Sequence, residues 1–260
     1  MLILNEEQYA KDLYDGKNQD IKSIMAKIRY ITRYLVHSEH KSDHAVYKDV
    51  VKWLNENHNN FDESSYSNVI SDAIKAAPKY PFYIIDSIKI TQSELEIISS
   101  LDNLRAEKIL FVLLCMAKQQ SMANGFTNGL VKYSITDLCK TARVSVPADD
   151  REYILYEIVQ RGLLGYPKKN NTQCLIVNFM STDEVVLELD ETDCQELAYV
   201  YLYWKNGNKG YTRCQRCGRW MKQSKTKPKK YCEECAKIVQ TEQKRLWAEK
   251  NRKNLTQQND

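Results

Sequence analysis

Apolar residues recur at helical spacing along much of the chain and at alternating spacing in a few short segments. In the first third, isoleucine, valine and leucine at steps of three and four residues predict three helices, over 5–36, 43–57 and 63–76. Pro78 ends the third helix, and residues 80–86 have the composition of a short strand or extended segment. Residues 1–90 are therefore predicted to form a helical N-terminal region.

The middle of the chain, residues 91–204, alternates helices with short β segments. A largely apolar helix is followed by a strand, two helices, the return strand of a hairpin, a further strand and a last helix, over 104–120, 130–133, 135–142, 149–161, 173–179, 185–189 and 191–204. This order resembles the winged helix-turn-helix domains of bacterial regulators and replication initiators. The resemblance implies a mainly α, α+β fold, with the helix at 149–161 in the position that enters the major groove.

Charges on the helix at 149–161 oppose DNA binding. The helix begins with Asp149 and Asp150 and carries further glutamates against two arginines. At the tip of the following hairpin, Lys168 and Lys169 are the residues that we expect to contact phosphates. Winged helices also serve as scaffolds or protein-binding modules, so both roles stay open.

The clearest chemical pattern lies near the C-terminus. Two C-x2-C pairs, separated by fourteen residues, are formed by Cys214, Cys217, Cys232 and Cys235. A gap of two residues lets two thiolates converge on one ion, and two such pairs complete a closed tetrahedral shell. Disulfides and buried packing are the alternatives. The spacing favours structural Zn²⁺, with no coordination position left for water or substrate.

The segment 213–253 resembles the treble-clef zinc fingers of many small bacteriophage and mobile-element proteins. It contains C-x2-C-G, a basic loop, Y-C-x2-C and a basic helix expected over 233–251. The whole chain also looks like phage or prophage proteins that end in such a finger. The resemblance implies zinc and a nucleic-acid partner, and nothing catalytic.

Charge distinguishes this finger from the rest of the chain. The net charge is +4, but residues 205–260 hold 16 basic and 5 acidic side chains, a balance of +11 that leaves −7 on residues 1–204. A concentrated positive field attracts phosphate backbones, although a lysine-rich surface can also serve only solubility. We expect DNA, or alternatively RNA, to be contacted by Arg213, Arg216, Arg219, Trp220, Lys222, Lys225, Lys227, Lys229 and Lys230. Trp220 has a second interpretation, as a cover for the metal site.

Catalytic motifs are missing from the sequence. His37, His40 and His44 have the spacing of a helical metal site, but their polar neighbours favour a connecting loop. His37-x-Glu39 is half of a zinc-deaminase signature whose proline–cysteine half does not follow. There is also no P-loop, G-x-G-x-x-G or H-E-x-x-H, so we expect no enzyme. A nuclease built from distant carboxylates is the remaining alternative.

Composition indicates an ordinary globular protein, with 43% hydrophobic and 28% charged residues. The longest apolar run, at 109–117, is shorter than the roughly 20 residues that cross a bilayer. The N-terminus turns acidic without a basic leader, so we expect a cytoplasmic protein without membrane contacts. The other four cysteines are expected to be small buried hydrophobes: Cys115, Cys139, Cys174 and Cys194.

Two functions follow from these patterns. The first is a zinc-dependent, non-catalytic nucleic-acid-binding accessory protein, such as a transcriptional regulator or a replication or recombination factor of a phage or mobile element. The alternative is a protein-interaction adaptor, or an inhibitor of a host protein, that binds its partner through the helical N-terminal region and the winged-helix-like domain. Three domains are predicted, over 1–90, 91–204 and 205–260.

Overall fold

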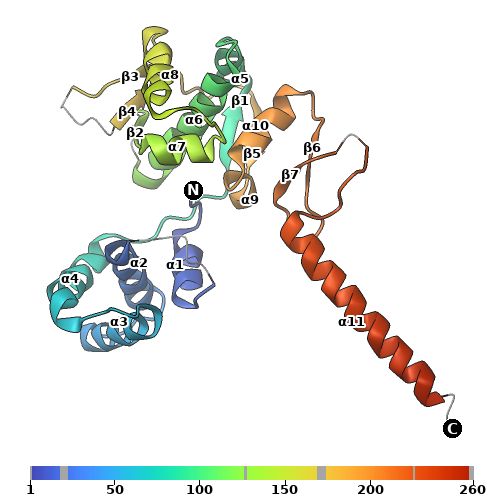
Figure 1. Cartoon of the computed structure of the whole chain (residues 1–260). Coiled ribbons are helices and arrows are strands. Elements are labelled where there is room, and N and C mark those ends of the chain that lie inside the picture. The colour runs from blue at the N-terminus through green and yellow to red at the C-terminus, as the bar shows by residue number, and fades with distance from the viewer. Residues whose placement is uncertain (1, 18–22, 126–127, 169–173, 225, 258–260) are drawn as a thin grey trace. The chain divides into compact units, whose positions relative to one another are not determined.

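The computed structural model describes residues 2–17, 23–125, 128–168, 174–224 and 226–257, with side chains up to Lys250. The fold is α+β, mainly helical with a few small sheets, as predicted (Figure 1). The chain divides into two compact units. The helical unit comprises Ile3–Ser87 and Met122–Asn124, and the mixed unit comprises Met1–Leu2, Ile88–Ser121 and Gly125–Asp260.

The helical unit packs four helices around one core: α1 (Glu6–Tyr14), α2 (Ile24–His37), α3 (Asp43–Asn57) and α4 (Glu63–Ala76). Ile31 and Leu35 of α2, and Val50 and Leu54 of α3, are fully buried and recur four residues apart. This spacing aligns them on one face of each helix. The helices α3 and α4 have the predicted bounds.

The single helix predicted over 5–36 is wrong, because the chain forms α1 and α2 in this range. Gly16 lies just beyond α1 in the left-handed conformation, with φ of 73°, which a helix cannot continue. Ser23 then caps α2, since its side chain accepts a hydrogen bond from the Ala26 N–H. The two helices are therefore separated by ordinary end signals that the apolar spacing alone had concealed.

The predicted strand at 80–86 is an extended segment that contributes an isolated β-bridge between Asn5 and Ile84. A regular strand follows it, because β1 (Ile88–Thr91) pairs antiparallel with β5 (Val185–Leu189) in the mixed unit. A short helix, α5 (Gln92–Ser99), comes directly after β1. Neither β1 nor α5 was predicted from the sequence.

The middle elements follow the predicted order of helix, strand, two helices and two strands. They are α6 (Leu104–Asn124), β2 (Leu130–Lys132), α7 (Ile135–Thr141), α8 (Ala148–Gln160), β3 (Leu164–Gly165) and β4 (Cys174–Val177). The strands form an antiparallel sheet in the order β2-β4-β3. Membership of the winged-helix class stays a prediction.

The helix predicted over 191–204 is divided into α9 (Glu191–Cys194) and α10 (Leu197–Lys205), because Glu196 leaves the helical conformation. The aromatic segment in α10 is partly core. Tyr201 is fully buried with its ring 5.2 Å from that of Phe111. Its hydroxyl donates to the buried carboxylate of Glu107 at 2.9 Å, and the Lys205 ammonium donates to the same oxygen.

Candidate metal centre

The first cysteine pair lies in the turn of a β-hairpin. Strands β6 (Tyr211–Arg213) and β7 (Trp220–Lys222) pair antiparallel, and Cys214 and Cys217 lie in the turn between them. The Cys214 N–H donates to the Arg219 carbonyl, and the Gly218 N–H donates to the Cys214 carbonyl, both at 2.9 Å. Gly218 has φ of 73°, which favours glycine at this position.

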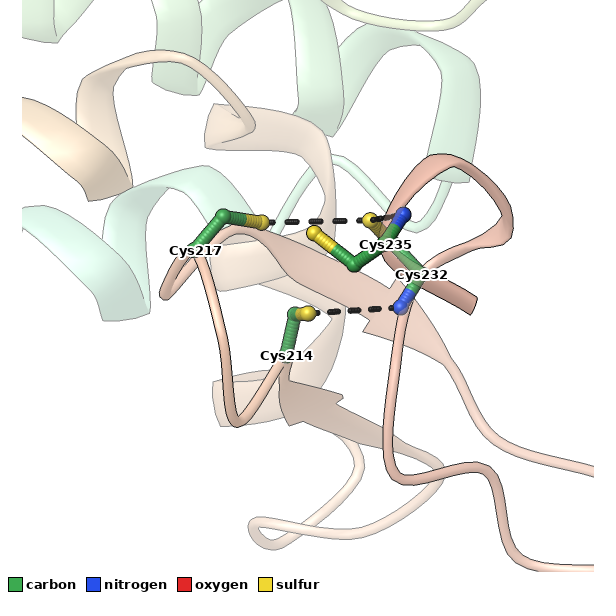
Figure 2. Close-up of side chains that lie close together, drawn as sticks. All are labelled: Cys214, Cys217, Cys232 and Cys235. Carbon is green, nitrogen blue, oxygen red and sulfur yellow. Dashed lines mark hydrogen bonds between the residues drawn. The ribbon is translucent and has the colours of Figure 1, made fainter. Parts of the chain in front are cut away.

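The second pair lies at the start of α11 (Glu233–Gln257). Cys232 immediately precedes the helix and Cys235 lies in its first turn, as the sequence predicts. The Gln215 N–H donates to the Lys230 carbonyl at 3.0 Å and so ties the hairpin turn to the approach to α11. Two cysteines from a hairpin turn and two from the start of a helix therefore face one another (Figure 2).

The spacing of the four sulfurs suits one metal ion. All four Sγ atoms lie within 4.8 Å of one another. A tetrahedral zinc site with Zn–S bonds of about 2.3 Å has sulfur–sulfur edges of about 3.8 Å. The Cys217 and Cys232 sulfurs are 3.8 Å apart (Figure 2). The cluster can therefore hold a metal ion, and its donor set and edge length fit zinc.

The electrostatics of the cluster also favour a cation. Burial raises the pKa of Cys214, but backbone N–H groups of Cys217, Cys232 and Arg216 outweigh burial and lower this pKa to about 6. Burial and the three neighbouring thiols raise the pKa of Cys235 to about 12. The cluster thus favours one thiolate and disfavours deprotonation of a second thiol, and a bound dication would favour deprotonation of all four.

The cysteine module, residues 206–257, packs on α9 and α10, and one buried carboxylate of α9 accepts hydrogen bonds from two of its side chains. The Asp193 side chain is 4% exposed and accepts hydrogen bonds from the Trp220 indole N–H at 2.5 Å and from the Arg213 guanidinium at 2.7 Å. Burial raises the pKa of Asp193, although Trp220 and Arg213 act in the opposite direction. Asp190 accepts a second bond from Arg213, at 3.0 Å.

Aromatic contacts complete the docked surface. The rings of Tyr203 and Trp220 are 4.8 Å apart, and those of Tyr199 and Tyr211 are 5.3 Å apart. The module therefore packs on α10 within the mixed unit. The predicted boundary at residue 205 stays a prediction about how the chain is organised, but it does not mark a break in packing.

Four of the residues predicted to contact nucleic acid make contacts within the protein. Arg213 and Trp220 bind Asp193. Arg216 forms a bidentate ion pair with Glu242, at 2.7 and 2.8 Å, and Arg219 pairs with Glu234 at 3.2 Å. The latter two pairs are exposed to solvent, and such pairs contribute about 1 kcal/mol or less.

The predicted lysines have a different environment. Exposed side chains are found at Lys168, Lys222, Lys227, Lys229 and Lys230. Within the part of the chain that the structure describes, none of these five takes part in an ion pair. Lys169 and Lys225 lie outside the described residues.

The remaining candidates do not form a second site. His37 approaches the Ala77 carbonyl at 2.9 Å, and His40 lies in the connection between α2 and α3, which agrees with the loop interpretation. Among the described residues, the four cysteines are the one cluster of histidine, cysteine or carboxylate side chains that could hold a metal. As expected, the other cysteines are buried: Cys115, Cys139, Cys174 and Cys194.

Sequence reasoning missed Asp193 and Tyr203, which receive the module. The only local signal at Asp193 is a capping box, since its side chain accepts from the Asp190 N–H while Asp190 accepts from the Asp193 N–H. That signal predicts a helix start. It contains nothing about Arg213, twenty residues away.

No described helix is both long enough and apolar enough to cross a membrane. Comparisons with protein-family models, with curated proteins and with solved structures found no match to this chain.

Proposed function

We propose that the protein is a non-catalytic accessory protein whose zinc-stabilised module binds nucleic acid, DNA in the first place and RNA as the alternative. Zinc would hold the hairpin turn and the start of α11 together, with Cys214, Cys217, Cys232 and Cys235 as ligands. Because four thiolates close the coordination shell, the ion would have a structural role. The resemblance to fingers of phages and mobile elements favours a transcriptional regulator or a replication or recombination factor.

The observation that carries this proposal is the charge of the module surface. Residues 205–232 contain ten lysines and arginines and no aspartate or glutamate. Lys222, at the end of β7, is exposed, and so are Lys227, Lys229 and Lys230 in the loop that connects β7 to α11. Closely spaced ammonium groups attract a phosphate backbone and release its counterions.

Hydrogen bonds fix the path of this loop. The Gln223 side chain spans it, because its Nε2 donates to the Lys229 carbonyl and its Oε1 accepts from the Lys229 N–H, both at 2.9 Å. The Lys230 carbonyl accepts from Gln215 in the cysteine turn. The lysine backbone is therefore ordered by the same contacts that bring the two cysteine pairs together, which reduces the entropy lost on binding.

The contacts that we propose read phosphates rather than bases. Lysine acts as a point charge, and Trp220 is engaged with Tyr203 and Asp193, so we leave Trp220 and Arg213 out of the binding surface. Arg216 and Arg219 can exchange their exposed glutamate partners for phosphates at little cost. We therefore expect binding with little sequence preference.

Titration of labelled duplex DNA, single-stranded DNA and RNA at several salt concentrations tests the proposal. The slope of log K against log salt concentration is negative for duplex DNA, and each lost phosphate contact reduces its magnitude by about 0.9. Replacing Lys222, Lys229 and Lys230 by alanine should therefore reduce the magnitude of that slope by up to about 3 and weaken binding at least roughly tenfold at low salt.

The matched control replaces three exposed lysines of the helical unit, Lys48, Lys52 and Lys75, and changes net charge equally. This control should retain the slope and the affinity. Binding that is absent at low salt, that ignores salt, or that falls equally in both triple variants would refute the proposed surface.

A further inference from the structure

Helix α8 presents tyrosines and carboxylates to solvent. Its inner face buries Ile154, Leu155 and Ile158. On the outer face, Tyr153 is 60% exposed and Tyr156 is 54% exposed. Carboxylates flank these rings on both sides along the helix, at Asp149, Asp150, Glu152 and Glu157. Large exposed aromatic side chains on a rigid helix are characteristic of protein-binding surfaces.

The arginines at 151 and 161, within and just after α8, donate to backbone carbonyls of the protein. Arg151 donates to the Val146 carbonyl at 3.4 Å, and Arg161 donates to the Ser100 carbonyl at 3.2 Å. Residues 148–160 carry four acidic side chains and one basic side chain, so the helix repels a phosphate backbone. The structure therefore weighs against DNA reading by α8, the role that the winged-helix resemblance implies.

One side of the tyrosine face is the wall of an open groove. The groove has a volume of about 590 Å³ and lies between α8 and the start of α6. Asp150, Tyr153 and Glu157 line it from α8, and Asp102 and Leu104 line it from the opposite side, with Arg105 beside them. Leu104, at the start of the largely apolar helix predicted over 104–120, is 45% exposed.

We propose that this groove docks a basic, arginine-rich segment of a partner protein. Three carboxylates face one guanidinium in the groove, which favours a cationic occupant. The exposed Tyr153 ring can stack with a guanidinium, and Leu104 can pack against its aliphatic stem. This surface is made by other elements than the lysine loop, so the inference does not depend on nucleic-acid binding by the module.

The test uses the full chain with its metal and a labelled twelve-residue peptide of alternating arginine and glycine. We expect saturable binding at low salt, tighter than that of the matched lysine peptide because arginine stacks better on tyrosine. Asp150→Asn combined with Glu157→Gln should weaken binding about three- to tenfold, and Tyr153→Ala should have a similar effect.

Matched controls lie on the same helix outside the groove. Asp149→Asn combined with Glu152→Gln removes the same charge, and Tyr156→Ala removes the same ring; both should leave peptide affinity unchanged. Equal losses in groove and control variants would show a general field effect and overturn the proposal, as would absence of peptide binding. The proposal also fails if the groove variants instead weaken duplex DNA binding, or abolish self-association in sedimentation, because the occupant is then nucleic acid or a second copy.

Discussion

Replacing Asp193 by alanine tests how much this buried carboxylate of α9 contributes to holding the cysteine module against α9 and α10. The change removes the acceptor of the Trp220 indole at 2.5 Å and of Arg213 at 2.7 Å. It also removes half of the capping box that starts α9, in which Asp193 accepts from the Asp190 N–H.

The size of the effect follows from these three contacts. A hydrogen bond to a charged acceptor contributes about 1.5–3 kcal/mol. The Arg213 side chain is 42% exposed and keeps Asp190 as a partner, so its ion pair adds less than about 1 kcal/mol. Losing the Asp193 half of the capping box, with the Asp190 N-cap still in place, costs less than the roughly 1 kcal/mol of a lost N-cap. Allowing for non-additivity, we expect Asp193→Ala to lower the free energy of unfolding of the mixed unit by about 3 kcal/mol.

Thermal unfolding followed by circular dichroism gives the answer. A loss of about 3 kcal/mol corresponds to a fall in Tm of roughly 6–12 °C for a unit of this size. The control is Glu234→Ala, which removes an exposed carboxylate from the 3.2 Å pair with Arg219 and should cost under about 1 kcal/mol. Equal, small shifts for both variants would mean that Asp193 does not hold the module in place.

Further predictions concern the metal, the thiols, the sheet and the loop. Cys217→Ser should abolish stoichiometric zinc in elemental analysis and lower the Tm. After zinc removal, the cluster should react with Ellman's reagent at neutral pH through Cys214, whose pKa is lowered to about 6, whereas Cys194, whose pKa burial raises to about 12, should react only in denaturant. Gly129→Ala should cost at least about 2 kcal/mol in urea unfolding, because its Cβ would overlap the Val177 carbonyl at a φ of 65°, whereas Gly207→Ala, in open space, should cost less. Gln223→Ala should weaken DNA binding severalfold without changing zinc content.

The four-cysteine cluster could be predicted from the sequence because its geometry is local. Two thiolates separated by two residues converge on one ion whatever the rest of the chain does, so the spacing of Cys214, Cys217, Cys232 and Cys235 was sufficient. Helix bounds such as those of α3 and α4 followed from apolar periodicity for the same reason. The division between α1 and α2 depended on Gly16, a local signal that the periodic pattern on either side overshadowed.

The docking of the module could not be predicted, because it depends on the path of the chain between distant segments. Asp193 and Arg213 meet only because the fold places α9 against the hairpin, and no pattern at either position indicates the other. For the same reason, charge counts assigned Arg213 to nucleic acid, although a buried carboxylate uses its guanidinium. Counting charges identifies the basic surface but cannot say which cations are already paired.

The β6–β7 hairpin connects the cysteine cluster to the side chains that bind Asp193. Arg213 and Trp220 are partners in the β6–β7 register, directly flanking the turn that carries Cys214 and Cys217. Any ion that closes this turn also fixes the two side chains that bind Asp193, and docking in turn holds the turn in its closed form. Thermodynamic linkage then requires the Asp193 contact and metal affinity to strengthen each other. The lysine loop is tied to the same turn through Gln215 and Lys230, so we expect a bound metal ion, the docked surface and the proposed phosphate contacts to depend on one another.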